Sequence, residues 1–329
     1  MSRPCGVRSS ATARYNDRAK INEGHATAGE KYSLNIAPSS PAKRWLIFGL
    51  WVLVSILVFA KPVSSLIQLA NQDESASHIL LIPFISAWLL YSERKEPLAV
   101  SGFALWPAMA LFLPSLLVGF ASLNCNACSP KARLSLYTLA LILLLDAGFV
   151  LIFGVEKAKT SWFGLAFLLF SVPLPDAVLS KIIYWLQAGS ATVAEVFFNL
   201  SGAPVLREGF VFRLPRLSIE VAQECSGIRS SLALLILALL VTHFSFRPLW
   251  KKIVFVLAGL SMMLIKNGIR IATLTLLANY VNPSFLNGRL HHQGGVVFFL
   301  IGLGLLLPVY WLLRKGEVSA VVAGPTVQG

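Results

Sequence analysis

The sequence is short of charge. Only 13% of its 329 residues are charged, 56% are hydrophobic, and the mean hydropathy is +0.71. A soluble domain of ordinary composition carries about a quarter charged residues. The apolar residues also form long runs that short polar loops interrupt, and such runs cannot make a surface that faces water. The shortage of charge therefore excludes a soluble globular protein and predicts a multi-pass membrane protein.

Carboxylates are the scarcer of the charged groups. There are 15 Asp and Glu residues against 28 Lys and Arg, which gives a formal net charge of +13. This excess does not indicate nucleic-acid binding, because the basic residues do not share one helix or one face. They lie in short loops beside apolar runs, as the positive-inside rule expects of cytoplasmic loops. We therefore expect no nucleic-acid partner.

Several familiar site signatures are absent. The sequence contains no glycine-rich phosphate loop, no paired-carboxylate cleft and no cluster of metal ligands, so it predicts neither a metal nor a cofactor. Residues 1–43 are polar and of mixed charge, without the apolar core of a cleavable signal peptide. We expect 1–43 to be a disordered cytoplasmic tail and 316–329 to be a second short cytoplasmic tail.

Cysteine is rare, with only Cys5, Cys125, Cys128 and Cys225. So few cysteines in so long a chain do not suit a disulfide scaffold. Cys125 and Cys128 form a C-x-x-C pair that is compatible with a disulfide or with half of a metal site. No second Cys/His pair stands nearby, and the sequence leaves the role of this pair open.

The apolar runs predict eight transmembrane helices in an all-α bundle that occupies 44–315. They cover approximately 45–60, 78–91, 103–122, 134–154, 161–176, 226–244, 253–279 and 291–313. Basic residues orient these spans. If the chain begins in the cytoplasm, the basic groups that flank the first span and follow the second, fourth, sixth and eighth spans all fall there. These groups contain Lys43, Arg44, Arg94, Lys95, Lys157, Lys159, Arg247, Lys251, Lys252, Arg314 and Lys315. Both termini are then cytoplasmic, and the protein lies in the plasma (inner) membrane.

Residues 177–224 are expected on the outer side. The stretch 177–200 is apolar enough to be a ninth span, but a crossing there would move the basic group of 247–252 outside. Its Ser, Gln, Lys181 and Glu195 follow a helical pattern, which favours an interfacial or re-entrant amphipathic helix. The stretch 201–224 alternates apolar and polar residues around Gly209 and Pro215, which predicts a short β-like loop.

Three reactive residues converge on the outer membrane face in this topology. Cys225 lies where the outer loop joins the sixth span, and His291 opens the last span. Arg270 follows Lys252 by 18 residues, which places it about 27 Å from the cytoplasmic edge of a core about 30 Å thick. Ionisable residues at such depths are costly and indicate function. Each also has a plain structural alternative: a small core cysteine, a snorkelling arginine and a helix-start cap.

The chemistry that these residue types suggest is acyl transfer. A cysteine thiolate is a strong nucleophile, and a nearby cation or the start of a helix favours it. His291 suits proton transfer to a leaving amine, and the fixed charge of Arg270 suits a developing oxyanion. Ser226 and Gly227 allow the backbone to turn closely after Cys225.

Three blocks resemble the signature blocks of the exosortase/archaeosortase family. They are ECSGIRSS (224–231), NGIR (267–270) and HHQGGVVFF (291–299). Further stretches are similar to other parts of the family, namely SHILLIPFISAWLL (77–90), FLLFSVPLPD (167–176), GAPVLREG (202–209) and LSIEVAQECSG (217–227). The similarity extends from about residue 45 to residue 313.

The resemblance implies a membrane cysteine transpeptidase that sorts proteins. Its partners would be exported proteins with a C-terminal motif, a membrane helix and a basic cluster, of the Pro-Glu-Pro (PEP-CTERM-like) type. By the resemblance, Cys225 is the nucleophile that forms a thioester, Arg270 binds the oxyanion or substrate carbonyl, and His291 is the acid/base. An unknown acceptor nucleophile (lipid, polysaccharide or water) then resolves the thioester, and membrane lipid is a further partner.

Further residues are candidates for supporting roles. Asn267 either orients Arg270 or is a packing amide, and Arg229 either favours the thiolate or binds lipid phosphate. Ser77 and His78 either line a substrate groove or cap a helix at the interface. The four-residue step to Gly295 favours His291 over its neighbour His292, which stays the alternative acid/base.

Two other functions remain open. One is a polytopic transporter or scaffold whose Arg270 and His291 line a polar path, although we find no internal repeat of the kind that transporters show. The other is a related protease that only hydrolyses. The sequence does not identify the sorting motif, the acceptor or the oligomeric state.

Overall fold

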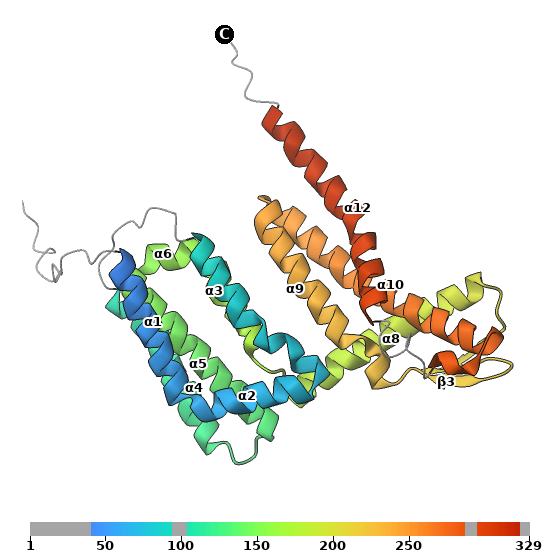
Figure 1. Ribbon diagram of the computed structural model, residues 1–329, viewed down its shortest axis with the longest axis horizontal. Helices are drawn as coiled ribbons and strands as arrows, with labels where there is room; N and C mark the ends of the chain where they lie inside the picture. Colours follow the sequence, from blue (N-terminus) through green and yellow to red (C-terminus); the bar gives the residue numbers. More distant parts are fainter. Residues whose placement is uncertain (1–40, 94–103, 287–294, 323–329) are drawn as a thin grey trace, which may run out of the picture.

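The computed structural model describes residues 41–93, 104–286 and 295–322 (Figure 1). Most of the predicted N-terminal tail and the segment that carries His291 and His292 lie outside the described residues. Two predicted boundaries differ from the structure. The first helix begins at Pro41, inside the expected tail, and the last helix continues to Val322, beyond the expected end of the domain at residue 315.

Helices make up nearly all of the described chain. The first half contains α1 (Pro41–Val58), α2 (Ala60–Gln72), η1 (Glu74–Leu80), α3 (Ile82–Ser92), α4 (Leu105–Asn124), α5 (Pro130–Phe153), α6 (Val155–Thr160), α7 (Trp162–Phe167) and η3 (Leu168–Ser171). The second half contains α8 (Asp176–Leu200), β1 (Leu206–Glu208), β2 (Val211–Arg213), β3 (Ser218–Glu220), η4 (Gln223–Ser226), α9 (Ile228–Ser245), α10 (Leu249–Tyr280), η5 (Pro283–Leu286) and α12 (Gly295–Val322). The prediction of an all-α polytopic membrane protein is confirmed.

Seven helical segments of the described chain are long and apolar enough to cross a membrane. They are Pro41–Val58, Ser75–Ser92, Leu105–Asn124, Pro130–Phe153, Ile228–Ser245, Leu249–Tyr280 and Gly295–Lys315. They coincide with seven of the eight predicted spans. The predicted span 161–176 is different: its helical part, Trp162–Ser171, rises only about 15 Å, half of the hydrocarbon core.

A break at two prolines explains this short helix. Pro173 and Pro175 lack the backbone N–H that a helix needs, so η3 ends at Ser171 and α8 begins only at Asp176. Trp162–Ser171 and α8 together pass as an eighth, broken span with a bend of 94°. The expected interfacial or re-entrant helix at 177–200 is therefore α8, joined to a half-span at this bend.

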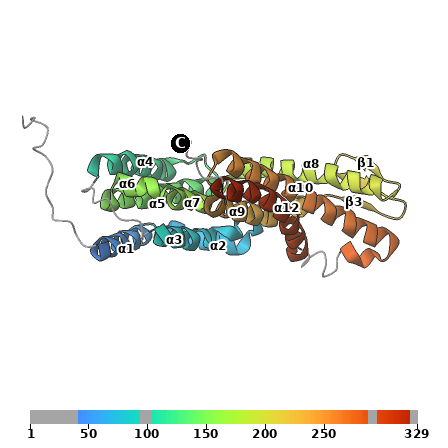
Figure 2. The ribbon, with the colours of Figure 1, turned by 90° about the horizontal axis from the view of Figure 1, so that it is seen from above.

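The two ends of the bundle differ in composition (Figure 1). One end carries the beginning of α1, α6, the α9–α10 connection and the end of α12. We call it the basic end, because it holds Lys43, Arg44, Lys157, Lys159, Arg247, Lys251, Lys252, Arg314 and Lys315. The other end, which we call the sheet end, carries α2, the α4–α5 connection, α8 and the three strands (Figure 1). Seen from above, the strands lie on the side of the molecule away from α1 (Figure 2).

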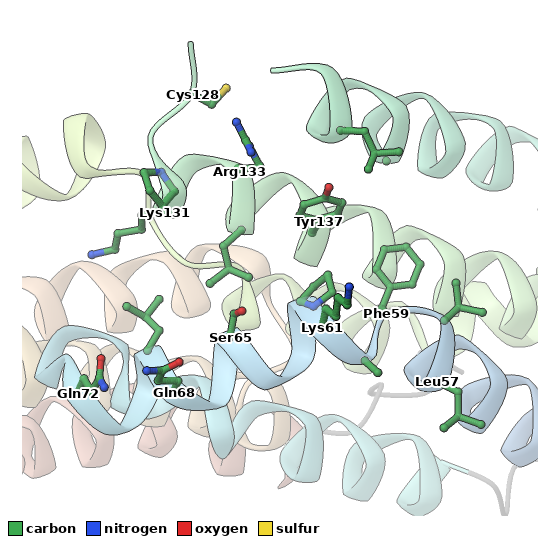
Figure 3. Close-up of a pocket in the computed structure, with 18 residues that line it drawn as sticks. Leu57, Phe59, Lys61, Ser65, Gln68, Gln72, Cys128, Lys131, Arg133 and Tyr137 are labelled. Atoms are coloured by element: carbon green, nitrogen blue, oxygen red, sulfur yellow. The ribbon is translucent and has the colours of Figure 1, made fainter. Parts of the chain in front are cut away.

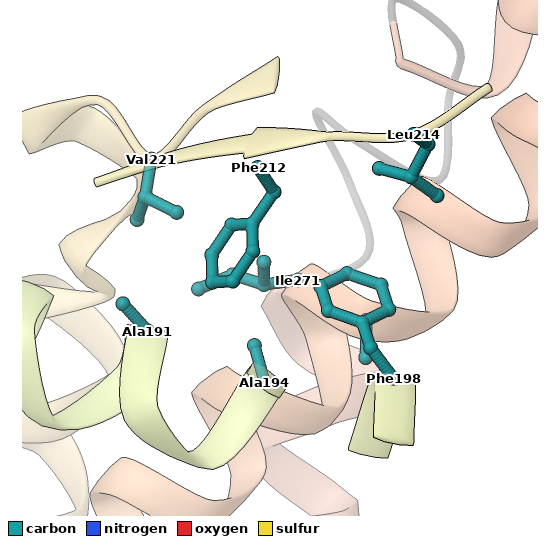
Figure 4. Close-up of a cluster of buried hydrophobic side chains, with 8 residues drawn as sticks. Ala191, Ala194, Phe198, Phe212, Leu214, Val221 and Ile271 are labelled. Carbon is teal, nitrogen blue, oxygen red and sulfur yellow. The ribbon is translucent and has the colours of Figure 1, made fainter. Parts of the chain in front are cut away.

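The strands form the small β structure that the sequence predicts for 201–224. They pair antiparallel in the order β1-β2-β3, with Phe212 opposite Ile219. Phe212 is fully buried and lies 5.1 Å, ring centre to ring centre, from Phe198 of α8 (Figure 4). Ile271 of α10 completes the contact, so the sheet covers the place where α8 and α10 meet. The sheet that leads to Cys225 is thus packed against α8 and α10.

Candidate active site

The chain reaches Cys225 from a strand that is fixed at its end. Beyond β3, the N–H of Val221 donates to the carbonyl of Phe210 at 2.9 Å. The buried amide of Gln187 in α8 donates to the carbonyl of Val221. Cys225 follows in η4, a single 3₁₀ turn. The backbone before the candidate nucleophile is therefore held on both sides.

A sharp turn separates Cys225 from its span. Gly227 has φ +68°, in the left-handed region that favours glycine. Its carbonyl accepts hydrogen bonds from the N–H of Ser231 at 2.9 Å and from the hydroxyl of Ser230 at 3.1 Å. The close turn expected at Ser226 and Gly227 is present. However, α9 begins only at Ile228, so Cys225 lies before the helix rather than in its first turn.

Ser226 adds an unusual feature beside the cysteine. Its side chain is 1% exposed, and its hydroxyl finds no hydrogen-bond partner among the described residues. A buried hydroxyl without a partner costs free energy, so its position beside Cys225 calls for an explanation.

Asn267 ties α10 to this turn. It is buried, and its Nδ2 donates to Ser190 Oγ of α8 at 3.0 Å. Its Oδ1 lies so close to Gly227 that a Cβ added there would be 2.7 Å away. The neighbouring Gly268 packs equally closely on Val193 of α8. These contacts give Asn267 a role in holding the turn after Cys225, beside the role toward Arg270 that the sequence suggested.

Lys266 is the residue that the sequence reasoning missed. It is 1% exposed, and its ammonium donates to Ser230 Oγ. Its stem packs on α12, where a Cβ added at Gly302 would be 3.1 Å from Lys266 Cδ. None of the carboxylates in the described residues forms an ion pair with Lys266. The sequence did contain a signal for Lys266. It is a second basic residue inside the apolar run 253–279, and it lies four positions before Arg270, on the same helix face.

Arg270 lies one turn beyond Lys266, about 6 Å along the axis of α10. It is half-buried and directly precedes Ile271 and Ala272, which pack beneath the sheet. Arg270 is thus at the level where α10 meets the sheet end.

His291 and His292 lie outside the described residues, and α12 begins just after them at Gly295. α12 packs against α10 and α9. Gly302 contacts Lys266, and α12 runs from Gly295 toward the basic end while α10 runs away from it (Figure 1). Moving back along α12 to Gly295 therefore leads in the same direction as moving from Lys266 to Arg270.

The remaining predicted residues that the structure describes are Arg229, Ser77 and His78. Arg229 is exposed on the first turn of α9. Ser77 and His78 lie in η1, which packs against α9, and the ring of His78 hydrogen-bonds to the backbone of Ser75 and Phe170. The cavity beside His78 has a volume of about 10 Å³, room for a single water, and the role of Ser77 and His78 stays a prediction.

The C-x-x-C pair is a disulfide. Cys125 and Cys128 are bonded, with their Cα atoms 5.4 Å apart, which resolves the alternative that the sequence left open. The described residues contain no group of three or more His, Cys, Asp or Glu that could hold a metal.

The site residues lie within a part of the chain that matches a family model. The family model for the transmembrane exosortase matches residues 70–308, well over half of the chain. The match includes η1, Cys225 and the segment Lys266–Arg270, together with positions 291 and 292. No curated protein and no solved structure matches the chain. The extent of the family match shows that the chain belongs to the transmembrane exosortase family.

Proposed function

We propose that this exosortase is a cysteine transpeptidase that cleaves the C-terminal sorting signals of exported proteins, of the PEP-CTERM type, and transfers them to an acceptor. One observation carries the proposal. The basic segment Lys266–Arg270 of α10 lies against the turn that follows Cys225, through the contact of Asn267 with Gly227. The turn that follows the candidate nucleophile therefore lies against the segment of α10 that carries both cations.

The orientation of the bundle supports an outward-facing site. The basic end suits the cytoplasm by the positive-inside rule, which places the sheet end outside. The disulfide between Cys125 and Cys128 is at the sheet end, and disulfides persist in oxidising compartments outside the cytoplasm. An exported substrate whose basic tail stays inside would present its motif at this level.

In the proposed first step, His291 takes the thiol proton of Cys225, and the thiolate attacks the carbonyl carbon of the scissile peptide bond. Arg270 donates to the oxyanion that forms. The carbon–nitrogen bond then breaks, His291 returns the proton to the leaving amine, and a thioester remains on Cys225. His292 stays the alternative for this proton transfer.

In the second step, an acceptor attacks the thioester. His291 removes the proton of the acceptor, the new bond forms, and the sulfur leaves and regains a proton. Water in the acceptor position gives hydrolysis, and an amine or hydroxyl gives transfer. Asn267, Ser226 and Gly227 support the turn, while Arg229 remains a candidate for contact with the substrate or with lipid.

Lys266 has a positioning role in this mechanism. Its ammonium holds Ser230, and Ser230 holds the carbonyl of Gly227 two residues after Cys225. Its buried charge also adds to the positive potential around Arg270, which favours the thiolate and the oxyanion.

The thioester is the most direct test. Purified enzyme with a tail-bearing substrate and hydroxylamine should release the substrate as a hydroxamate, because hydroxylamine attacks thioesters. The Cys225→Ala variant should release none, while a Cys125→Ser/Cys128→Ser control should match the wild type. Hydroxamate formation by Cys225→Ala would refute the mechanism. A polytopic transporter or scaffold would give no hydroxamate with any variant.

A further inference from the structure

A large groove lies at the sheet end, away from Cys225. Its volume is about 1180 Å³, and it is lined by the end of α1, α2, the end of α4 and the beginning of α5 (Figure 3). The disulfide-bonded Cys128 lies at its edge. Ordinary small-molecule sites have volumes of roughly 300–1,000 Å³, so this space suits a larger, elongated ligand.

The polar face of α2 is turned into this groove. Lys61, Ser65, Gln68 and Gln72 recur at helical spacing, and all four line the groove opposite α5 (Figure 3). On the other side of α2, Ala70 is buried in a cluster with Ala76 and Ile79. An interfacial helix ordinarily presents its polar face to water or headgroups, and here that face borders a cavity.

The charge of the groove has one sign. Lys61, Lys131 and Arg133 line it, and none of its described lining residues is Asp or Glu. Lys131 is already paired with Asp73 at 3.0 Å and with Asp176 at 3.4 Å. Lys61 and Arg133 are the cations that remain for a ligand.

Arg133 carries an unused donor. Its Nη2 donates to the carbonyl of Cys125 at 2.8 Å, which fixes the guanidinium beside the disulfide loop. Its Nε is buried without a hydrogen-bond partner among the described residues. A guanidinium fixed at the edge of the groove is suited to a phosphate oxygen.

The remainder of the groove is apolar and open. Leu57, Val58 and Leu123 line it and are 65%, 72% and 66% exposed, in helices that span the membrane. The groove thus joins cations to exposed apolar side chains at the ends of α1 and α4. We propose that it binds an anionic glycerophospholipid, with the phosphate at Arg133 and Lys61 and an acyl chain along Leu57 and Leu123. An acidic peptide would leave this apolar part unused.

Photolabelling of the full-length protein in nanodiscs tests this site. The probes are phosphatidylglycerol and phosphatidylcholine, each at trace level with a photoreactive group beside the headgroup. The wild type should label with phosphatidylglycerol, on peptides of α2 and the beginning of α5. A cation at an anionic lipid surface contributes about fivefold in affinity, so Lys61→Gln/Arg133→Gln should reduce labelling roughly 30-fold.

Two further variants make the test specific. Lys181→Gln/Arg213→Gln removes two cations from exposed positions of the sheet end and should label like the wild type. Ser65→Trp keeps every charge but fills the groove from an exposed position of α2, and it should lose labelling. If Arg133→Gln disturbs the disulfide loop, Ser65→Trp still tests the groove, because it leaves Arg133 unchanged.

Several results would overturn the proposal. Equal labelling by the two lipids, or labelling that neither groove variant reduces, would show that the groove is no anionic-lipid site. Displacement of the lipid by inorganic phosphate would indicate a site for small anions, and displacement by an acidic substrate peptide would indicate a peptide site. Each outcome is independent of whether Cys225 is catalytic.

Discussion

The amide oxygen of Asn267 occupies the space that a side chain at Gly227 would need. A Cβ at Gly227 would be 2.7 Å from Asn267 Oδ1, a distance that real Cβ atoms do not show. Asn267 of α10 therefore packs directly on Gly227, the residue before α9, two residues after the candidate nucleophile. Because Asn267 is itself bonded to Ser190, it has little freedom to withdraw.

Gly227→Ala should reduce substrate processing by at least about tenfold. An alanine with φ near +68° costs roughly 1–2 kcal/mol, and the clash with Asn267 must also displace the turn that carries Cys225. Gly202→Ala is the matched control, because Gly202 has the same φ of +68° but no atom within 4 Å of the added Cβ. Processing rates at equal enzyme levels compare the two. An equal effect of both variants would mean that backbone strain alone matters.

Lys266→Met should lower processing by about tenfold or more without lowering the melting temperature. Methionine fills the space beside Gly302, and removal of a buried charge that lacks a carboxylate partner relieves its desolvation cost. The loss of a fixed cation weakens stabilisation of the oxyanion. The exposed Lys181→Met is the control. A large drop in melting temperature with a proportional loss of activity would make Lys266 purely structural.

Asn267 and Ser190 should be coupled in a double-mutant cycle. Asn267→Ala leaves the buried hydroxyl of Ser190 without its donor, which costs about 1–3 kcal/mol of stability. The double variant Asn267→Ala/Ser190→Ala should therefore cost less than the sum of the single changes, by at least about 0.5 kcal/mol. Unfolding followed in mild detergent measures this coupling, and strictly additive effects would contradict the contact.

The disulfide provides a test of orientation. In intact cells, a membrane-impermeant reductant followed by an impermeant maleimide should label Cys125 and Cys128, because we place the sheet end outside. Maleimide without the reductant should leave both unlabelled, since they are bonded to each other. Labelling of Cys125 and Cys128 only after the cells are lysed would mean that the topology is reversed and that the active site faces the cytoplasm.

Much of this architecture is readable from local patterns. Long apolar runs and basic loops predict seven of the spans, and the amphipathic pattern of 177–200 predicts α8. The alternation around Gly209 predicts the sheet. Each of these signals lies within one stretch of the chain, where hydrophobicity and turn residues decide the outcome.

The features that the sequence did not predict depend on contacts between distant parts of the chain or on a break in a helix. The run 161–176 is apolar throughout, and Pro173 and Pro175 divide it into a half-span and an extended connection. In the sequence, Lys266 is a single cation in an apolar run. Its contacts with Ser230 of α9 and Gly302 of α12 exist only in the folded protein. The resemblance to the family indicated Cys225 and Arg270, whereas the contacts of Asn267 with Ser190 and Gly227 follow only from the packing of α8, α9 and α10.

The role of Cys225 is tested most directly by the processing of a tail-bearing substrate in cells. Wild type, Cys225→Ala, Cys225→Ser and the Cys125→Ser/Cys128→Ser control are compared by substrate size on a gel, at equal enzyme levels. We predict that both Cys225 variants leave the substrate unprocessed, because a serine hydroxyl is not ionised at neutral pH, and that the control processes it. Processing by Cys225→Ala at the wild-type level would contradict the cysteine transpeptidase and favour a transporter or scaffold.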